Sequence, residues 1–418
     1  TWSLAQPFRI LAHNGEINTL KGNVNWMKAH ETRITDKFFG DRVEDLKPIL
    51  DSDASDSASL DAAFEILLQT DRSLPMTKSM IIPEAWSNNN DMPDELKKMY
   101  AYCNAVIEPW DGPAAVCANF GDWIISGMDR NGLRPLRYII TDDDLLISGS
   151  EVGMVIIDDK NILKKGRVGP GELIAINYKE KKFYQSNDLK TQLSSQFPYV
   201  KWNKNTILLD EILNQQKISE PASQNIDNSK IISKYFNYTI ELLDLILDPM
   251  AIAGQEALGS MGDDTPLSVL TDNYRGLHTF FKQNFAQVTN PPIDSLREQI
   301  VMSLKTRLGN LGNIADSDED QLNLVLLESP ILLDHELYAL KSHLEKNTTE
   351  IDCTFEKEKE TNFLQEIQRI YLEAERAVRS GSQHIILSDK KIDESKISLP
   401  MILVTSAVHN YLIKNKLR

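Results

Sequence analysis

Two adjacent residues near the start of the sequence, Asn14 and Gly15, are of the types that bind a developing negative charge. A short apolar run ends at Ala12, and Asn18 and Thr19 follow the pair as candidate caps of a helix. A strand, a turn and a helix in this order could aim the Asn14 side-chain amide and the Gly15 backbone N–H at one point. Two donors that are fixed before charge develops stabilise the oxyanion of a tetrahedral intermediate. Asn-Gly is also the dipeptide best suited to a tight turn, and these residues alone favour a plain hairpin turn.

A carboxylate that could bind a ligand lies within the serine- and aspartate-rich residues 51–57. The apolar pattern over residues 58–68 predicts an amphipathic helix that begins there. Ser and Asp are typical helix caps, so the residues alone favour an over-capped helix start. Asp56 would nevertheless lie at the N-terminus of that helix. A carboxylate stays ionised at such a position and can pair with the ammonium group of a ligand.

Other patterns exclude several kinds of site. The glycines of residues 254–266 are spaced like those of a phosphate loop, but the Lys-Ser/Thr that completes one is absent, which argues against nucleotide binding there. The three cysteines are scattered and form no Cys-x-x-Cys pair, so they predict neither a disulfide framework nor a metal site. Apolar surroundings favour buried structural thiols at Cys103 and Cys117, which fits a reducing compartment.

The composition is that of a soluble globular protein, with 41% hydrophobic and 25% charged residues. A length of 418 residues predicts two or three domains. No apolar run reaches the ~18 residues of a membrane span, and residues 1–30 show no secretory signal. The net charge of −16 argues against binding to nucleic acid or to an anionic membrane, because both would repel an acidic surface.

The patterning divides the chain into three parts. Residues 1–199 mix helices with short strands, residues 200–232 are polar and are predicted to be a linker around one short helix, and residues 233–418 alternate helices with brief apolar strands. In the third part, one apolar face over residues 363–378 predicts a helix, and a strand at 384–387 and a last helix follow. This order favours an α/β layer arrangement.

In the first part, strands are predicted at residues 114–120, 122–128, 136–141 and 144–149. Their connections carry Gly, Asn and Asp, so the four strands are expected to form an antiparallel meander with a tight turn at each corner. The connection over residues 129–135 is therefore interpreted as a hairpin turn with solvated arginines, and no catalytic role is assigned to it.

A longer string around the Asn-Gly pair resembles the glutaminase domain of glutamate synthases, a class II glutamine amidotransferase of the N-terminal-nucleophile kind. The string consists of Gln6-Pro7-Phe8-Arg9 and Ala12-His13-Asn14-Gly15-Glu16-Ile17-Asn18-Thr19. Further matching strings lie at residues 55–61, 129–135, 254–266, 285–294, 326–332 and 386–389. The resemblance implies an α+β and α/β protein, with part of an N-terminal-nucleophile αββα sandwich over residues 1–199 and an α/β central domain over residues 233–418.

The same resemblance implies roles for the candidate residues. Asn14 and Gly15 would form the oxyanion hole, and Asp56 would bind the amino group of L-glutamine. The complete enzyme would hydrolyse L-glutamine and send the ammonia through a tunnel to 2-oxoglutarate. Reduced FMN would reduce the resulting imine, so that two L-glutamate are formed. Residues 233–418 would connect the two sites and help to line the tunnel.

Cofactors and partners are implied only for the complete enzyme. No cofactor or metal site is expected in this chain, whereas FMN and a 3Fe–4S cluster are implied for the full-length protein. The electron donor would be ferredoxin or an NAD(P)H-oxidising subunit, and residues 260–264 and 308–313 are slightly more similar to the ferredoxin-dependent group. A cytoplasmic or plastid-stroma location is implied as well.

The resemblance also implies that the chain is a middle portion of the enzyme. The nucleophilic cysteine and the arginine that grips the glutamine carboxylate would lie upstream of Thr1. The flavin-binding barrel and its iron–sulfur cysteines would lie downstream of Arg418. The chain alone is therefore expected to lack glutaminase activity. The alternative, from another class, is a non-enzymatic scaffold that retains the amidotransferase fold without its nucleophile.

Overall fold

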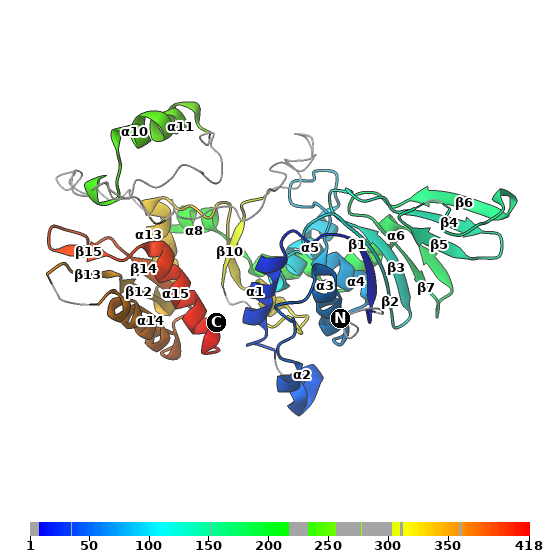
Figure 1. Cartoon of the computed structure of the whole chain (residues 1–418), viewed down its shortest axis with the longest axis horizontal. Helices are drawn as coiled ribbons and strands as arrows, with labels where there is room; N and C mark the ends of the chain where they lie inside the picture. The colour runs from blue at the N-terminus through cyan, green and yellow to red at the C-terminus, as the bar shows by residue number, and fades with distance from the viewer. Residues whose placement is uncertain are drawn as a thin grey trace. The chain divides into compact units, whose positions relative to one another are not determined.

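The computed structural model describes residues 8–34, 36–151, 153–216, 233–255, 277, 303–309, 312–358 and 362–418. These residues form two compact units, and Figure 1 labels most of their elements. The first unit contains the described residues up to Asn214 together with those of 292–332. The second contains the described residues of 215–291 together with 333–418.

The first unit combines helices with two antiparallel sheets. Its main α-helices are α1 (Leu20–His30), α2 (Asp36–Phe39), α3 (Asp56–Leu68), α4 (Leu74–Ile81), α5 (Asp94–Val106), α6 (Ser186–Ser194) and α7 (Tyr199–Trp202). The five-stranded sheet has the order β1 (Leu11–Gly15), β2 (Ala114–Phe120), β3 (Trp123–Met128), β7 (Leu173–Asn177) and β8 (Lys182–Tyr184). The three-stranded sheet has the order β5 (Leu146–Gly149), β4 (Arg137–Thr141) and β6 (Ile162–Arg167).

Helices cover one face of the five-stranded sheet. α3 contacts β1, α4 contacts β2 and β3, and α6 contacts β7. The side chains between them are apolar and buried; Phe64 of α3, Met80 of α4 and Ile125 of β3 are at most 1% exposed. Burial of one such side chain stabilises the fold by about 1.5–3 kcal/mol, and this holds the helices on the sheet.

The other face of the five-stranded sheet packs on the three-stranded sheet. Ala115 and Ile174 of the first sheet form one apolar cluster with Tyr138 of the second sheet and with Val168, just after β6. Val116, next to Ala115, belongs instead to the core under the helices, because successive strand residues point to opposite faces. The order of helices, sheet and sheet confirms the expected fold class, part of an αββα sandwich.

The four predicted strands are present, with bounds within two residues of the prediction, as β2, β3, β4 and β5. The predicted meander, however, is wrong. β3 pairs with β2 and β7, while β4 lies in the other sheet between β5 and β6. Residues 129–136 therefore cross from one sheet to the other and do not close a hairpin. Gly and Asn serve both kinds of connection, so turn chemistry could not separate them.

The described part of the predicted linker, residues 200–216, is folded. The expected short helix is present as α8 (Leu209–Gln216). Before it, β9 (Ile207–Leu208) pairs in parallel with β11 (Leu324–Leu327). The polar composition suggested a linker, but pairing with a strand far away in the sequence holds the segment. Residues 217–232 lie outside the described residues.

A late segment of the sequence completes the first unit. β10 (Thr306–Gly309) pairs antiparallel with β11, and between these strands Ile314 and Leu322 join the unit's main apolar core. The buried guanidinium of Arg72 donates hydrogen bonds to the carbonyl oxygens of Ala315 and Asp316. The compact units therefore do not coincide with the division predicted at residue 233.

The second unit has the predicted α/β arrangement. β12 (Thr348–Asp352) and β14 (His384–Ser388) are parallel, and α14 (Phe363–Arg379) lies between them in the chain, as a parallel pair requires. α15 (Met401–Lys414) packs on α14. The other elements are α10 (Ile240–Leu242), α11 (Asp248–Ala253), α13 (Asp334–His343), β13 (Thr354–Glu356) and β15 (Lys396–Ser398). The helix and the strand predicted at 363–378 and 384–387 are confirmed.

Candidate active site

Asn14 and Gly15 form the end of β1. Both residues are paired with β2 in the antiparallel ladder. The pairing continues past the strand, since the N–H of Glu16 donates a hydrogen bond of 2.8 Å to the carbonyl oxygen of Pro113. The interpretation of Asn-Gly as a plain hairpin turn is therefore wrong, because the chain does not reverse at this point.

The ladder directs the Gly15 N–H away from β2. In an antiparallel pair, residues that exchange hydrogen bonds with the opposite strand alternate with residues that do not. Glu16 bonds to Pro113, so the preceding N–H, that of Gly15, faces the other side of β1. Among the described strands β1 lies at the edge of its sheet, which leaves this donor on the open side.

Two glycines allow the backbone segments to pass closely here. A Cβ on Gly15 would lie 1.8 Å from the carbonyl oxygen of Pro113, and a Cβ on Gly112 would lie 2.0 Å from the carbonyl oxygen of Glu16. Gly112 also has a φ of +150°, which residues with a side chain rarely adopt. Only glycine fits these positions, so the pair sets the spacing between β1 and the segment before β2.

The Asn14 side chain contacts two residues of the three-stranded-sheet region. Its Oδ1 accepts a hydrogen bond from Nη2 of Arg134, in the crossing between the sheets. Its Nδ2 donates to Oγ of Ser150, just after β5, at 3.2 Å. The side chain is exposed, so its amide can reach a ligand.

Helix α3 places Asp56 beside the segment that follows Gly15. The cap of this helix is Ser55, whose Oγ accepts a hydrogen bond from the N–H of Ala58. Asp56 is the first helical residue, and its Oδ2 accepts a hydrogen bond of 2.9 Å from the N–H of Ile17. The side chain is still 21% exposed, which leaves room for a further donor. The helix start that was predicted to be over-capped therefore has one cap, Ser55. The Asp56 carboxylate instead contacts the backbone of Ile17.

His13 belongs to this site, although it was not among the predicted site residues. Its Nδ1 lies 2.8 Å from Oγ of Ser57 and 3.9 Å from Oδ2 of Asp56. Burial lowers the pKa of His13; the charge of Asp56 acts in the opposite direction, and that of Arg134 adds to the lowering. A neutral imidazole therefore lies between β1 and α3 at neutral pH. The alternation of side chains along β1 could have indicated that His13 faces away from Asn14, since neighbouring strand residues point to opposite faces.

A buried carboxylate holds the crossing between the sheets. Asp129 is 1% exposed. Its Oδ1 accepts hydrogen bonds from the N–H groups of Asn131 and Gly132, and its Oδ2 accepts one from the N–H of Ala114 at the start of β2. The crossing is thereby fixed to the strand that pairs with β1.

Arg130 ties the same crossing to the segment before β2. Its guanidinium makes hydrogen bonds of 2.9 and 2.6 Å to the Asp111 carboxylate. The carbonyl oxygen of Asp111 in turn accepts a hydrogen bond of 2.8 Å from the N–H of Asn18. The prediction of solvated arginines in residues 129–135 is therefore wrong. No local signal could have shown this, because the partners come from segments far away in the sequence.

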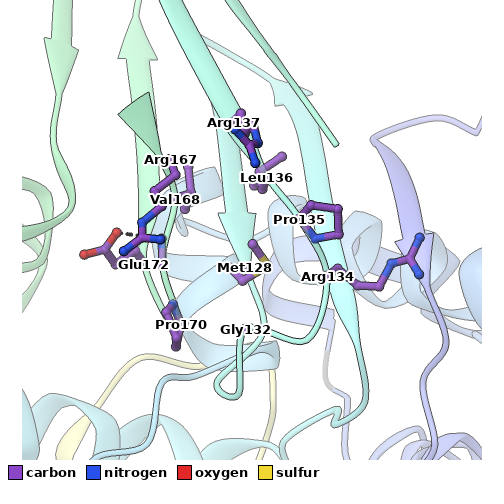
Figure 2. A pocket seen from close by; sticks show the side chains of 11 residues that line it. Met128, Gly132, Arg134, Pro135, Leu136, Arg137, Arg167, Val168, Pro170 and Glu172 are labelled. Atoms are coloured by element: carbon purple, nitrogen blue, oxygen red, sulfur yellow. Dashed lines mark hydrogen bonds between the residues drawn. The ribbon is translucent and has the colours of Figure 1, made fainter. Parts of the chain in front are cut away.

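A pocket of about 770 Å³ opens beside the crossing. The crossing, β4 and the segment after β6 line it, and its charged residues are Arg134, Arg137, Arg167 and Glu172. In Figure 2 the Arg134 side chain extends from the crossing toward β1, whereas Arg137 and Arg167 lie on neighbouring strands. The wall of this pocket is mainly basic in a chain whose net charge is −16.

Among the described residues, no group of three or more His, Cys, Asp or Glu side chains could hold a metal ion. Within the same described ranges, no helix combines the length and the apolar character needed to cross a membrane.

Cys103 and Cys353 are buried and Cys117 is half-buried. Burial raises the pKa of Cys103 to about 12, so this thiol stays protonated. In the loop of residues 254–266, residues 256–266 lie outside the described residues.

Known proteins match the chain in two consecutive parts. Residues 1–202 match the family model of class-II glutamine amidotransferases, and residues 232–418 match that of the glutamate synthase central domain. The chain is 51% identical to the large chain of NADPH glutamate synthase from Azospirillum brasilense and 40% identical to the one from Bacillus subtilis. It is also 40% identical to the ferredoxin-dependent glutamate synthase of Pyropia yezoensis.

These alignments cover 100% of this chain but only 28%, 27% and 27% of the respective relatives. The chain thus spans between a quarter and a third of their length. Both family models match in the order amidotransferase, then central domain, and each of these relatives is a glutamate synthase that aligns along the whole chain. The chain therefore belongs to the glutamate synthase family.

Proposed function

We propose that this chain is the part of a glutamate synthase that stabilises the oxyanion during glutamine hydrolysis and connects that site to the rest of the enzyme. The complete enzyme would hydrolyse L-glutamine, add the ammonia to 2-oxoglutarate and reduce the product, giving two L-glutamate. Family membership supports the overall reaction, and the geometry around Asn14 supports the local step.

The observation that carries the proposal is the pair of donors at the end of β1. When a nucleophile attacks the side-chain amide of glutamine, the carbonyl oxygen gains negative charge. Nδ2 of Asn14 and the N–H of Gly15 would bind that oxygen. The β1–β2 ladder and the close passage at Gly112 fix these donors before the reaction, which is the condition for effective oxyanion stabilisation. The nucleophile would be the N-terminal cysteine that the family resemblance implies.

Asp56 would bind the amino group of the same glutamine. Its Oδ2 is oriented by the N–H of Ile17, three residues after Asn14, and the carboxylate remains partly exposed. A charge-assisted hydrogen bond to the substrate ammonium would hold the far end of glutamine. The scissile amide would then lie at a fixed distance from that anchor, which supports a role for Asp56 in binding.

Residues 233–418 would connect the glutaminase site to the site that consumes ammonia. FMN and a 3Fe–4S cluster belong to the complete enzyme in this proposal, and the described cysteines do not fit the cluster. A cluster needs thiolates, whereas the Cys103 thiol is buried and protonated. Nothing in the comparisons supports the alternative of a non-enzymatic scaffold.

The electron donor would be an NAD(P)H-oxidising subunit. This rests on the 51% identity to the NADPH-type large chain of Azospirillum brasilense alone, since the NADPH-type large chain of Bacillus subtilis and the ferredoxin-dependent relative of Pyropia yezoensis are both 40% identical to this chain. It departs from the slight similarity of two strings to the ferredoxin-dependent group. The location, cytoplasm or plastid stroma, stays a prediction.

The test is the Asn14→Ala variant in the complete enzyme. We expect the glutaminase kcat to fall by ~10²–10³, the usual loss for one oxyanion donor, while the KM for glutamine changes far less. Glutamate synthesis from externally supplied ammonia should continue. Asn18→Ala, four residues further along the same segment, is the matched control and should keep the wild-type kcat. A wild-type kcat in Asn14→Ala would overturn the proposal.

A further inference from the structure

We propose that Arg134 is a positioning residue that fixes the Asn14 amide as an oxyanion donor, an inference that rests on the proposed glutaminase step. An asparagine amide has an oxygen that only accepts and a nitrogen that only donates, and half a turn about its last side-chain bond exchanges them. Only the nitrogen can bind an oxyanion. A neighbouring group must therefore select the orientation.

Two side chains contact the Asn14 amide, and only one of them selects its orientation. The Ser150 hydroxyl can donate or accept, so it fits either orientation. The Arg134 guanidinium carries only donors, so the atom that faces its Nη2 must be Oδ1. Nδ2 is thereby placed on the other side of the amide. In the described structure one of its two N–H groups goes to Ser150, and the second is left for a ligand.

Arg134 is itself held in place by the crossing that carries it. Gly132, two residues earlier, has a φ of +67°, and a Cβ there would lie 2.6 Å from Cγ of Pro170. The Asp129 carboxylate binds the N–H of the same glycine at 2.8 Å. The guanidinium therefore leaves a backbone that has little freedom to move.

The Arg134 charge is not shared with a carboxylate among the described residues. Its Nε is buried without a hydrogen-bond partner there, and its Nη2 contacts Asn14. A full positive charge next to Oδ1 polarises the amide, which makes the Nδ2 hydrogens better donors. The effect is largest when negative charge develops on the bound oxygen, so Arg134 would act on kcat more than on substrate binding.

The first experiment compares Arg134→Met with Arg137→Met in the complete enzyme. Arg137 lines the same pocket, on β4, and makes no contact with Asn14 in the described structure. In Arg134→Met we expect the glutaminase kcat to fall by about 10²-fold, with the KM for glutamine within about threefold of wild type. Ammonia-dependent glutamate synthesis should be unchanged in both variants, and Arg137→Met should keep its glutaminase kcat. Equal kcat values for the two variants would overturn the inference.

The second experiment is a double-mutant cycle with Asn14→Ala. If Arg134 acts through Asn14, the double variant will be no slower than Asn14→Ala alone, because the amide that Arg134 orients is already gone. A merely structural role would make the two losses multiply, and that result would also overturn the inference. If Asn14→Ala by itself keeps the wild-type kcat, the proposed function fails and not this inference alone.

Arg134→Lys covers the case in which Arg134→Met also loses ammonia-dependent synthesis through misfolding. Lysine keeps the charge and carries only donors, so it selects the same amide orientation, though without the planar fork of arginine. We expect a glutaminase loss of about tenfold, normal ammonia-dependent synthesis and no further loss when Asn14→Ala is added. A loss in Arg134→Lys that multiplies with that of Asn14→Ala would reject the positioning role.

Discussion

Both compact units have an apolar core, but they differ in the polar and charged side chains that they bury. Of the buried polar and charged side chains in the described ranges, Thr354 and Glu366 belong to the second unit, and the others, among them Asp61 and Asp129, belong to the first. The core of the second unit is otherwise apolar, with Ile370 and Ala374 of α14 fully buried at its centre.

The difference shows what each unit is built for. A buried polar group destabilises a fold unless it is hydrogen-bonded, and the net gain of such a bond is small. In the first unit Asp61 accepts hydrogen bonds from three backbone N–H groups, those of Arg9, Ile10 and Leu11, and so fixes the start of β1. Polar burial thus fixes backbone positions in the first unit, in addition to the stability that its apolar core supplies, whereas the core of the second unit supplies stability almost alone.

The largest expected effect comes from moving the site without removing a functional group. Gly112→Ala would place a Cβ 2.0 Å from the carbonyl oxygen of Glu16 and 2.8 Å from the nitrogen of Asn18, so the segment after Gly15 must shift. We expect the glutaminase kcat of the complete enzyme to fall by at least ~10²-fold, as for the loss of one oxyanion donor.

Its control is Gly121→Ala. That glycine also has a positive φ, +57°, but a Cβ there meets nothing within 4 Å. The control should keep its kcat. If both variants were equally active, the close passage at Gly112 would have no part in the site.

A core truncation in the second unit should affect stability and not the position of the site. Ile370→Ala removes a fully buried side chain, 0% exposed, and should lower the free energy of unfolding by ~2–5 kcal/mol. Hydrogen exchange followed by mass spectrometry should show faster exchange only in peptides of the second unit, those from α14, β12 and α15. Leu364→Ala, 68% exposed on the same helix, is the control. Faster exchange in β1 as well would show that a loss of stability in the second unit also disturbs the strand that positions the site in the first unit.

A smaller effect is expected from Asp56→Asn, which removes a charge and keeps an acceptor for the N–H of Ile17. The KM for glutamine should rise by an amount equivalent to ~1.5–3 kcal/mol, the range for hydrogen bonds to charged groups. Asp53→Asn, from the same cluster, should leave the KM unchanged. An unchanged KM with a lower thermal stability in Asp56→Asn would instead make Asp56 a structural residue.

The smallest effect concerns pH. Because burial lowers the pKa of His13 in the folded protein, the unfolded chain takes up a proton first as the pH falls below about 6.5. The stability of the first unit should therefore decrease below that pH. His13→Asn lacks this component, so its free energy of unfolding should fall less steeply between pH 7 and pH 5.5, measured by urea denaturation. Parallel curves for the two proteins would contradict the prediction.

The sequence was informative wherever a pattern is local. The strands β2 to β5 and the helices α3 and α14 follow from periodicity, capping and turn residues, because these act within a few positions of each other. The string around Asn14 and the cluster around Asp56 pointed to the candidate site for the same reason. The structure brings the two together through the hydrogen bond from Ile17 to Asp56 and the contact between His13 and Ser57.

The rest of the site depends on contacts between distant segments. Nothing in the composition of residues 129–135 shows that they cross between sheets, and their turn chemistry suggests a hairpin. Arg134 meets Asn14 only because β4 lies in the second sheet. The polar composition of residues 200–216 likewise gave no sign of the pairing between β9 and β11, since pairing partners are chosen in three dimensions and leave no periodicity in either segment.

The pairing of β9 with β11 also affects how the polypeptide folds during synthesis and where it can be truncated. While the ribosome has produced residues only as far as 202, Arg72 has no carbonyl of Ala315 or Asp316 to bind, and the apolar surface that Leu322 covers is open to water. Completion of this unit during translation must wait for the later segment. A truncated gene for expression should accordingly end after residue 332, where the unit ends, and not after residue 202, where the amidotransferase match ends.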